Sequence, residues 1–164
     1  MTPDEITDII KVSIWKGNIV IVYRQMRDCG EDTRSLMSSE FPRPELEAAL
    51  RLLAPYFTDY CGMSRDDVEG LIVYEARFTY DKDTGAPAIK MKAKKAIAGT
   101  KELMNLTSIK LERDGLIGWT ADFRQRVEDL QEEARRFICG ERGQTELAFR
   151  RNEETEETND ESTD

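Results

Sequence analysis

The sequence predicts an α+β domain with a mainly antiparallel sheet of about five strands, in the order β-β-α-β-β-β-α. Two pairs of short runs alternate apolar and polar residues, and turn residues join the members of each pair. Residues 120–140 repeat apolar side chains at helical spacing. The last residues are acidic or polar and cannot form a core. We therefore expect one domain over residues 1–150 and a disordered acidic tail over residues 151–164.

The first predicted element is a β-hairpin. Ile10, Val12 and Ile14 alternate with polar or outward-facing residues, and a β-branched run at 19–23 follows the turn residues 16–18. Such a pair of runs around a short turn is typical of two antiparallel strands.

A helix is predicted after a polar segment. Residues 28–39 lack any period and predict a loop or a ragged strand. Pro44 suits the first position of a helix, and Pro55 should kink or end it. Cys61-Gly62 is a plausible stop. The apolar stripe of this helix consists of Leu46, Leu50, Leu53 and Phe57.

A second hairpin should follow at residues 71–80 and 89–94. The turn residues 81–85 lie between these two alternating runs. Residues 103–112 predict a weaker third strand. On the first run, the face predicted to turn inward consists of Ile72, Tyr74, Ala76, Phe78 and Tyr80.

The last predicted element is a helix that Thr120 caps and Gly140 ends. Its apolar side chains recur every three or four residues, as a helix packed on one face requires. They are Phe123, Val127, Leu130, Ala134, Phe137 and Ile138.

The composition argues against the common catalytic signatures. The chain has no histidine, which excludes histidine-dependent triads and histidine-containing zinc sites. Phosphate-binding, dinucleotide-binding and nucleophile-elbow motifs are absent. We therefore expect no enzymatic activity, no catalytic residue, no metal site and no cofactor. Carboxylates Glu75, Asp81 and Asp83 beside Lys90 could hold magnesium, but turn chemistry explains the two aspartates better.

Cysteine content and hydropathy predict a location. Cys29, Cys61 and Cys139 are odd in number and far apart, which fits a reducing compartment. No apolar segment approaches the roughly 20 residues needed to cross a bilayer. We expect a cytoplasmic protein, without membrane contact.

The most informative feature is the segregation of charge. The net charge is −9, of which residues 151–164 contribute −6. Residues 86–101 contain five lysines and no acid. The predicted nucleic-acid-binding residues are Lys90, Lys92, Lys94, Lys95, Lys101 and Trp15.

These lysines have a spacing that suits a phosphate backbone. Lys90, Lys92 and Lys94 should share one strand face at intervals of about 6.5 to 7 Å, close to the phosphate spacing of an extended single strand. Trp15, with Tyr23 or Tyr80, could supply stacking surfaces, whereas Tyr74 and Phe78 should belong to the core. The alternatives are lysines that only solvate a strand or protect its edge, and an acidic protein partner.

The acidic tail has two interpretations. It could simply keep the domain soluble, as acidic termini often do. It could also fold back on the lysines and be displaced by DNA, as in many single-strand binding proteins. Those proteins often end in a hydrophobic residue that docks partners, whereas this sequence ends in residues 161–164, Glu-Ser-Thr-Asp.

Three segments resemble a family of small bacteriophage and prophage proteins. They are residues 38–53, the run at 70–85 that ends in Phe78-Thr79-Tyr80, and the closing helix with residues 140–149. The resemblance covers most of residues 10–149 and implies an early gene for replication, recombination or host takeover. Residues 104–109 depart from the family, which has an Asn-rich strand end leading to a proline there.

The resemblance and the charges favour a non-enzymatic phage-type protein that binds single-stranded nucleic acid as an accessory in replication or recombination. The first alternative is an anti-CRISPR-like inhibitor of a host nuclease, with Glu128, Glu132, Glu133 and the tail as a DNA mimic. The second is an adaptor protein without nucleic-acid contact. The partner would be a single strand or a host or phage nucleic-acid-processing protein. Pairing of two copies through an exposed strand edge stays open.

Overall fold

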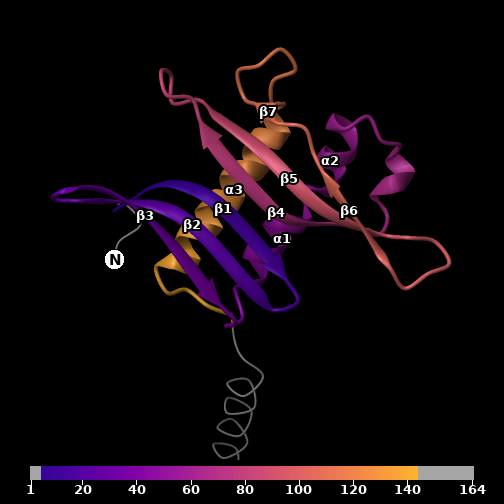
Figure 1. Cartoon of the computed structure of the whole chain (residues 1–164), viewed down its shortest axis with the longest axis horizontal. Coiled ribbons are helices and arrows are strands. Elements are labelled where there is room, and N and C mark those ends of the chain that lie inside the picture. Colours follow the sequence, from indigo (N-terminus) through magenta and orange to yellow (C-terminus); the bar gives the residue numbers. More distant parts are fainter. Residues whose placement is uncertain (1–4, 144–164) are drawn as a thin grey trace, which may run out of the picture.

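The computed structural model describes residues 5–143, which form one antiparallel sheet backed by helices (Figure 1). The strand order is β3-β2-β1-β4-β5-β6, and the short β7 pairs with β5 beside β6. The sheet thus consists of an N-terminal meander, β1 to β3, joined through β1 and β4 to a C-terminal meander. The strands are β1 (Ile6–Trp15), β2 (Asn18–Arg27), β3 (Gly30–Ser38), β4 (Leu71–Tyr80), β5 (Pro87–Ala96), β6 (Leu103–Thr107) and β7 (Leu111–Glu112).

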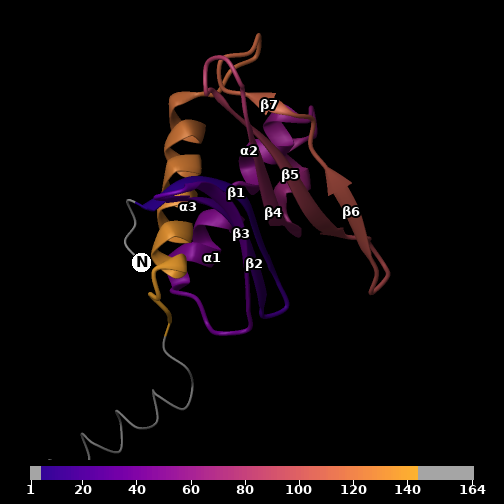
Figure 2. The ribbon, with the colours of Figure 1, turned by 60° about the vertical axis from the view of Figure 1, so that its left-hand side comes forward.

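The helices lie on one face of this sheet, as Figure 2 shows from the side. They are α1 (Pro44–Arg51), α2 (Ala54–Tyr60), the 3-10 turn η2 (Arg65–Val68) and α3 (Ala121–Ile138). The predicted break at Pro55 is confirmed, because α1 ends at Arg51 and Pro55 stands in the first turn of α2. Thr120 caps α3 as predicted, by accepting a hydrogen bond from the backbone N–H of Phe123.

The core lies between the sheet and the helices. Alternate residues of β1, β2, β4 and β5 point toward the apolar stripes of α1, α2 and α3. The largest fully buried side chains include Phe57, Phe78, Phe123 and Phe137. Four buried rings in this interface remove much apolar surface from water, which is the main stabilising term of a domain of this size.

The α+β class, the mainly antiparallel sheet and both hairpins are confirmed, but the predicted strand count and order are wrong. Residues 28–39, predicted as a loop or a ragged strand, contain β3, which pairs with β2 along its whole length. The predicted single strand at 103–112 is two strands, because Ser108 interrupts it. The backbone N–H of Ser108 donates to the carbonyl of Met91, and its hydroxyl accepts from the N–H of Met91.

A β-bulge in β4 changes which side chains face the core. The register between β4 and β5 shifts between Val73 and Glu75. Leu71 and Val73 are buried before this point, and Ala76 and Phe78 after it. The extra residue at the bulge switches the alternation, as bulges do. The prediction that Tyr74 faces the core is therefore wrong, and its half-buried ring lies on the opposite face.

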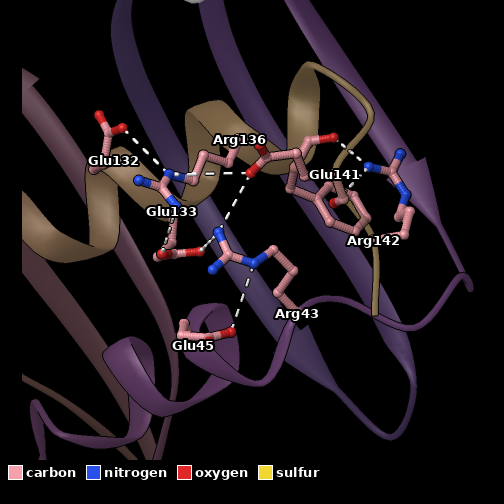
Figure 3. A network of polar contacts seen from close by, with 8 residues as sticks. Arg43, Glu45, Glu132, Glu133, Arg136, Glu141 and Arg142 are labelled. Atoms are coloured by element: carbon pink, nitrogen blue, oxygen red, sulfur yellow. Dashed lines mark hydrogen bonds and ion pairs between the residues drawn. The ribbon is translucent and has the colours of Figure 1, made fainter. Parts of the chain in front are cut away.

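Ion pairs fasten the segment before α1 to the end of α3 (Figure 3). The Arg43 guanidinium lies 3.4 Å from the Glu133 carboxylate and 3.3 Å from that of Glu141. Arg142 reaches back to Glu40 at 2.7 Å, and the backbone N–H of Gly143 donates to the carbonyl of Phe41. These contacts hold the chain that enters α1 against the chain that leaves α3.

Two further predictions concern the limits of the described chain. The acidic tail of residues 151–164 lies outside residues 5–143, as does the end of the predicted domain at residue 150. Within residues 5–143, no helix is both long and apolar enough to cross a membrane.

Candidate nucleic-acid interface

The sheet face opposite the helices, here called the open face, carries the candidate site. No helix within residues 5–143 covers this face, which the side view shows (Figure 2). Side chains that alternate with the core residues of β1, β4 and β5 point to it. Five of them are cationic: Lys11, Arg77, Lys90, Lys92 and Lys94.

Two aromatic rings and a lysine form one end of the open face. The rings of Trp15 on β1 and Tyr74 on β4 have centroids 5.9 Å apart and are tilted by 57°. The Lys94 ammonium lies 4.9 Å from the Trp15 centroid and 5.1 Å from the Tyr74 centroid. It also donates a hydrogen bond to Oδ1 of Asn105 on β6 at 3.0 Å. A cation is thus held beside two half-exposed π faces.

Next to this aromatic end, three cations surround one carboxylate. Glu75 lies 3.4 Å from the Lys11 ammonium, 3.5 Å from that of Lys92 and 3.7 Å from the Arg77 guanidinium. Its side chain is only 7% exposed, and its Oε2 has no hydrogen-bond partner among the described residues. One carboxylate therefore neutralises a fraction of the positive charge gathered there.

The sheet register places like charges directly opposite one another. Lys11 pairs with Arg77 across β1 and β4, and Arg77 pairs with Lys90 across β4 and β5. Like charges in such cross-strand positions repel and destabilise a sheet. Only Glu75 offsets this repulsion among the described neighbours, and it makes no ion pair with Lys90. An anionic ligand would relieve the remaining repulsion.

The predicted lysines fall into three environments. Lys90, Lys92 and Lys94 lie on the open face of β5. Lys95 points the other way, where its ammonium donates to the carbonyls of Asp67 at 2.6 Å and Glu69 at 3.4 Å. It therefore fastens η2 to the sheet. Lys101 is exposed in the connection between β5 and β6.

Trp15 is the only one of the three proposed stacking residues that the structure places on the open face. Tyr23 is buried in the core. Tyr80 packs against the core, and its hydroxyl donates to the carbonyl of Ile9 at 2.7 Å. The proposal that Tyr23 or Tyr80 offers a stacking surface is therefore wrong, whereas the half-buried ring of Tyr74 lies on the open face beside Trp15.

The carboxylates considered for magnesium do not gather in one site. Glu75 lies in the middle of the sheet among cations, whereas Asp81 and Asp83 belong to the turn between β4 and β5. The Asp81 carboxylate accepts backbone N–H bonds from Thr84 and Asp83, which lower the pKa of Asp81 below its ordinary value. Within residues 5–143, no three Cys, Asp or Glu side chains are arranged to hold a metal ion.

The glutamates of α3 that could mimic DNA are all engaged by arginines. Glu128 pairs with Arg124 at 3.2 Å, and Glu132 pairs with Arg136 at 3.4 Å. Glu133 pairs with Arg43, as Figure 3 shows. Mixed charge of this kind does not reproduce the continuous negative charge of a phosphate backbone.

Four residues of the open face were not assigned to the site from the sequence: Lys11, Arg77, Glu75 and Tyr74. Lys11 and Arg77 alternate with buried residues, which is the signal that places them on the open face, but their cross-strand pairing requires the register. Glu75 alternates with Ala76 on the same side as Arg77, but its ion pairs also require the register, and the position of Tyr74 depends on the bulge in β4. No family model matches the chain, and no match was found among curated proteins or solved structures.

Proposed function

We propose that the protein binds single-stranded nucleic acid on the open face of its sheet, without catalysing a reaction. The observation that carries the proposal is the placement of the Lys94 ammonium beside both Trp15 and Tyr74. Nonspecific binders of single strands combine aromatic surfaces for bases with cations for phosphates. A role in phage replication or recombination is the setting that the resemblance to phage early proteins implies.

The electrostatics of the open face support this proposal. Where β1, β4 and β5 form it, five cations share the open face with the buried Glu75 carboxylate, although the chain as a whole carries −9. A local positive patch on an acidic protein concentrates anions at that patch and leaves the other surfaces repulsive to them. The aromatic rings of the patch can stack with the bases of a single strand, whereas the bases of a duplex are already stacked on one another.

The first test measures the binding of a fluorescent oligothymidylate of about 15 nucleotides to the full chain at about 50 mM salt. Trp15→Ala should weaken binding about 10-fold, because stacking on an aromatic ring contributes about 1 to 3 kcal/mol per base. Trp15→Phe keeps a ring and should retain most of the affinity. A duplex of the same length should bind more weakly than the single strand.

A matched control distinguishes binding at the open face from general electrostatic attraction between the protein and the oligonucleotide. The triple variant Lys90→Gln, Lys92→Gln, Lys94→Gln should lose most binding and reduce the salt dependence. A control with the same charge loss, Lys82→Gln, Arg124→Gln, Arg126→Gln, changes residues of a turn and of α3 and should bind almost normally. Equal loss in both triple variants, or no binding by the unaltered protein, would refute the proposal.

A further inference from the structure

The three lysines of β5 form a straight column on the open face. Lys90, Lys92 and Lys94 occupy alternate positions, with Met91 and Ala93 buried between them. Alternate residues of a strand are about 6.5 to 7 Å apart, so the column is about 13 Å long. Consecutive phosphates of an extended single strand are separated by about 6 to 7 Å. The column therefore matches three consecutive phosphates.

The column ends on both sides at uncharged residues of β5. The next alternate positions are Ala88, which is buried opposite Thr79, and Ala96, which faces Leu103 of β6. Neither alanine can contact a phosphate through a charged group. A longer nucleic acid would extend past both ends of the column, where β5 offers its phosphates no further cation.

The two ends of the column offer different contacts. At the Lys94 end, the rings of Trp15 and Tyr74 can stack with a base. At the Lys90 end, Arg77 and then Lys11 lie in the same row on neighbouring strands. Neighbouring strands are about 4.8 Å apart, which is closer than consecutive phosphates of an extended strand. These three cations can therefore converge on one phosphate.

The middle of the column is the weakest position for a phosphate. Lys92 lies 3.5 Å from Oε2 of Glu75, which is buried and has no hydrogen-bond partner among the described residues. A phosphate that approaches Lys92 must share this ammonium with the carboxylate. Glu75 also pairs with Lys11 and Arg77, but Lys90 makes no ion pair with it, so only the middle phosphate depends on a single cation that the carboxylate already engages. Repulsion between Glu75 and the phosphate reduces the gain at this position.

From these contacts we infer that the open face binds three consecutive nucleotides of a single strand. One base lies against Trp15 and Tyr74, and the three phosphates lie along Lys94, Lys92 and Lys90, the last also held by Arg77 and Lys11. The inference rests on the proposed function and adds the length of the ligand and the position of its parts.

The test is a length series of 5′-phosphorylated oligothymidylates, from one to about ten nucleotides, with the unaltered full chain. Affinity should rise steeply up to three nucleotides. Beyond this length it should rise only slightly, because a longer oligomer offers several overlapping three-nucleotide stretches to the same site. In the trinucleotide, one phosphate at a time is replaced by a neutral group, which at a linkage is a methylphosphonate. The loss of affinity should be smaller when the replaced phosphate lies at Lys92 than when it lies at Lys90. Glu75→Gln should reduce this difference, because it removes the charge that competes with the phosphate for Lys92.

The outcomes distinguish the inference from the proposed function. If long oligomers bind and need the β5 lysines, but affinity climbs steeply beyond about six nucleotides, the three-nucleotide site is wrong while the proposed function stands. A uniform effect of neutral linkages that Glu75→Gln does not alter would also overturn the assignment of positions. If no oligomer binds at low salt, the proposed function itself fails.

Discussion

Tyr80 links two strands through its hydroxyl, which donates to the carbonyl of Ile9 across the β1–β4 boundary. Burial of the ring raises the pKa of Tyr80 to about 12, and the nearby Asp8 carboxylate adds to the effect. The phenol is therefore protonated in the folded protein at pH values where the unfolded chain has begun to ionise. The neutral form contributes full stability below the ordinary pKa of 10.0 and loses it as pH rises toward 12.

We expect the free energy of unfolding to fall by about 2 kcal/mol through Tyr80 between pH 10 and pH 12. Urea denaturation at several alkaline pH values measures this slope. Tyr80→Phe removes the ionisable group, so the difference between the two proteins isolates the contribution of Tyr80 from that of the lysines and Tyr23. Parallel pH profiles for the two proteins would contradict the expectation.

Glu75 has an effect on stability that opposes its effect on binding. Glu75→Gln leaves Lys11, Arg77 and Lys92 without their shared carboxylate. We expect a loss of about 1 to 2 kcal/mol of stability, less than for a fully buried pair because the cations can be re-solvated. Oligonucleotide affinity should rise several-fold at the same time, because one negative charge leaves the open face.

Urea denaturation and oligonucleotide titration of the Glu75→Gln protein measure both effects. The stability loss should shrink as salt screens the repulsion among the cations. Glu112→Gln is the control, because Glu112 is 61% exposed and pairs only loosely with Lys110 at 3.8 Å. A Glu75→Gln protein that binds more weakly would show that the carboxylate positions the cations rather than opposing the ligand.

The N-terminus of α3 has a side-chain cap. Thr120 accepts the Phe123 N–H at 3.2 Å, and its own N–H donates to the Tyr60 hydroxyl at 3.1 Å. Thr120→Ala should destabilise the protein by about 1 kcal/mol, because one N–H of the first turn loses its acceptor. Thr120→Ser keeps the oxygen and should be close to the unaltered protein in thermal or urea unfolding. Equal losses in both variants would assign the effect to the threonine methyl group.

Elements with strong periodicity could be predicted from the sequence, and elements that depend on a neighbour could not. The α3 stripe and both hairpins follow from local patterns. In β3, Glu31, Asp32 and Thr33 are all exposed, so no apolar alternation marks the strand. It forms because β2 offers a complete row of partners from Ile19 to Arg27.

The same distinction explains the candidate site. The alternation of Lys90, Lys92 and Lys94 with apolar residues is enough to place these three lysines together on one face of a strand. The bulge between Val73 and Glu75 is a property of the β4–β5 register, and the amino-acid pattern of β4 does not reveal it. Without the bulge, Tyr74 is assigned to the core face, and the aromatic end of the site is lost.

At the scale of the molecule, Arg43 connects segments that are far apart in the sequence. It contacts Glu133, whose side chain is 14% exposed, and Glu141 at the end of α3 (Figure 3). Arg43→Met should cost about 1 to 2 kcal/mol of stability, because the largely buried Glu133 carboxylate loses a partner. A double-mutant cycle with Glu133→Gln in urea denaturation should show a coupling energy of at least about 0.5 kcal/mol.

Arg124→Gln provides the comparison for this cycle, since Arg124 and Glu128 are both more than half exposed. Its effect should stay within about 0.5 kcal/mol. Strictly additive effects of the Arg43 and Glu133 substitutions would mean that the ion pair does not hold the two helices together.

The two meanders of the sheet meet along a short boundary. β1 and β4 pair only through Lys11 and Arg77, Val12 and Ala76, and Ser13 and Glu75, whereas β2 and β3 pair from Ile19 to Arg27. A strand of nucleotides that touches both Lys11 and Lys92 would span this boundary. The bound ligand would then stabilise the β1–β4 boundary from the face of the sheet opposite the helices. The amides of Val12 and Ala76 would therefore exchange their hydrogens more slowly when the ligand is bound.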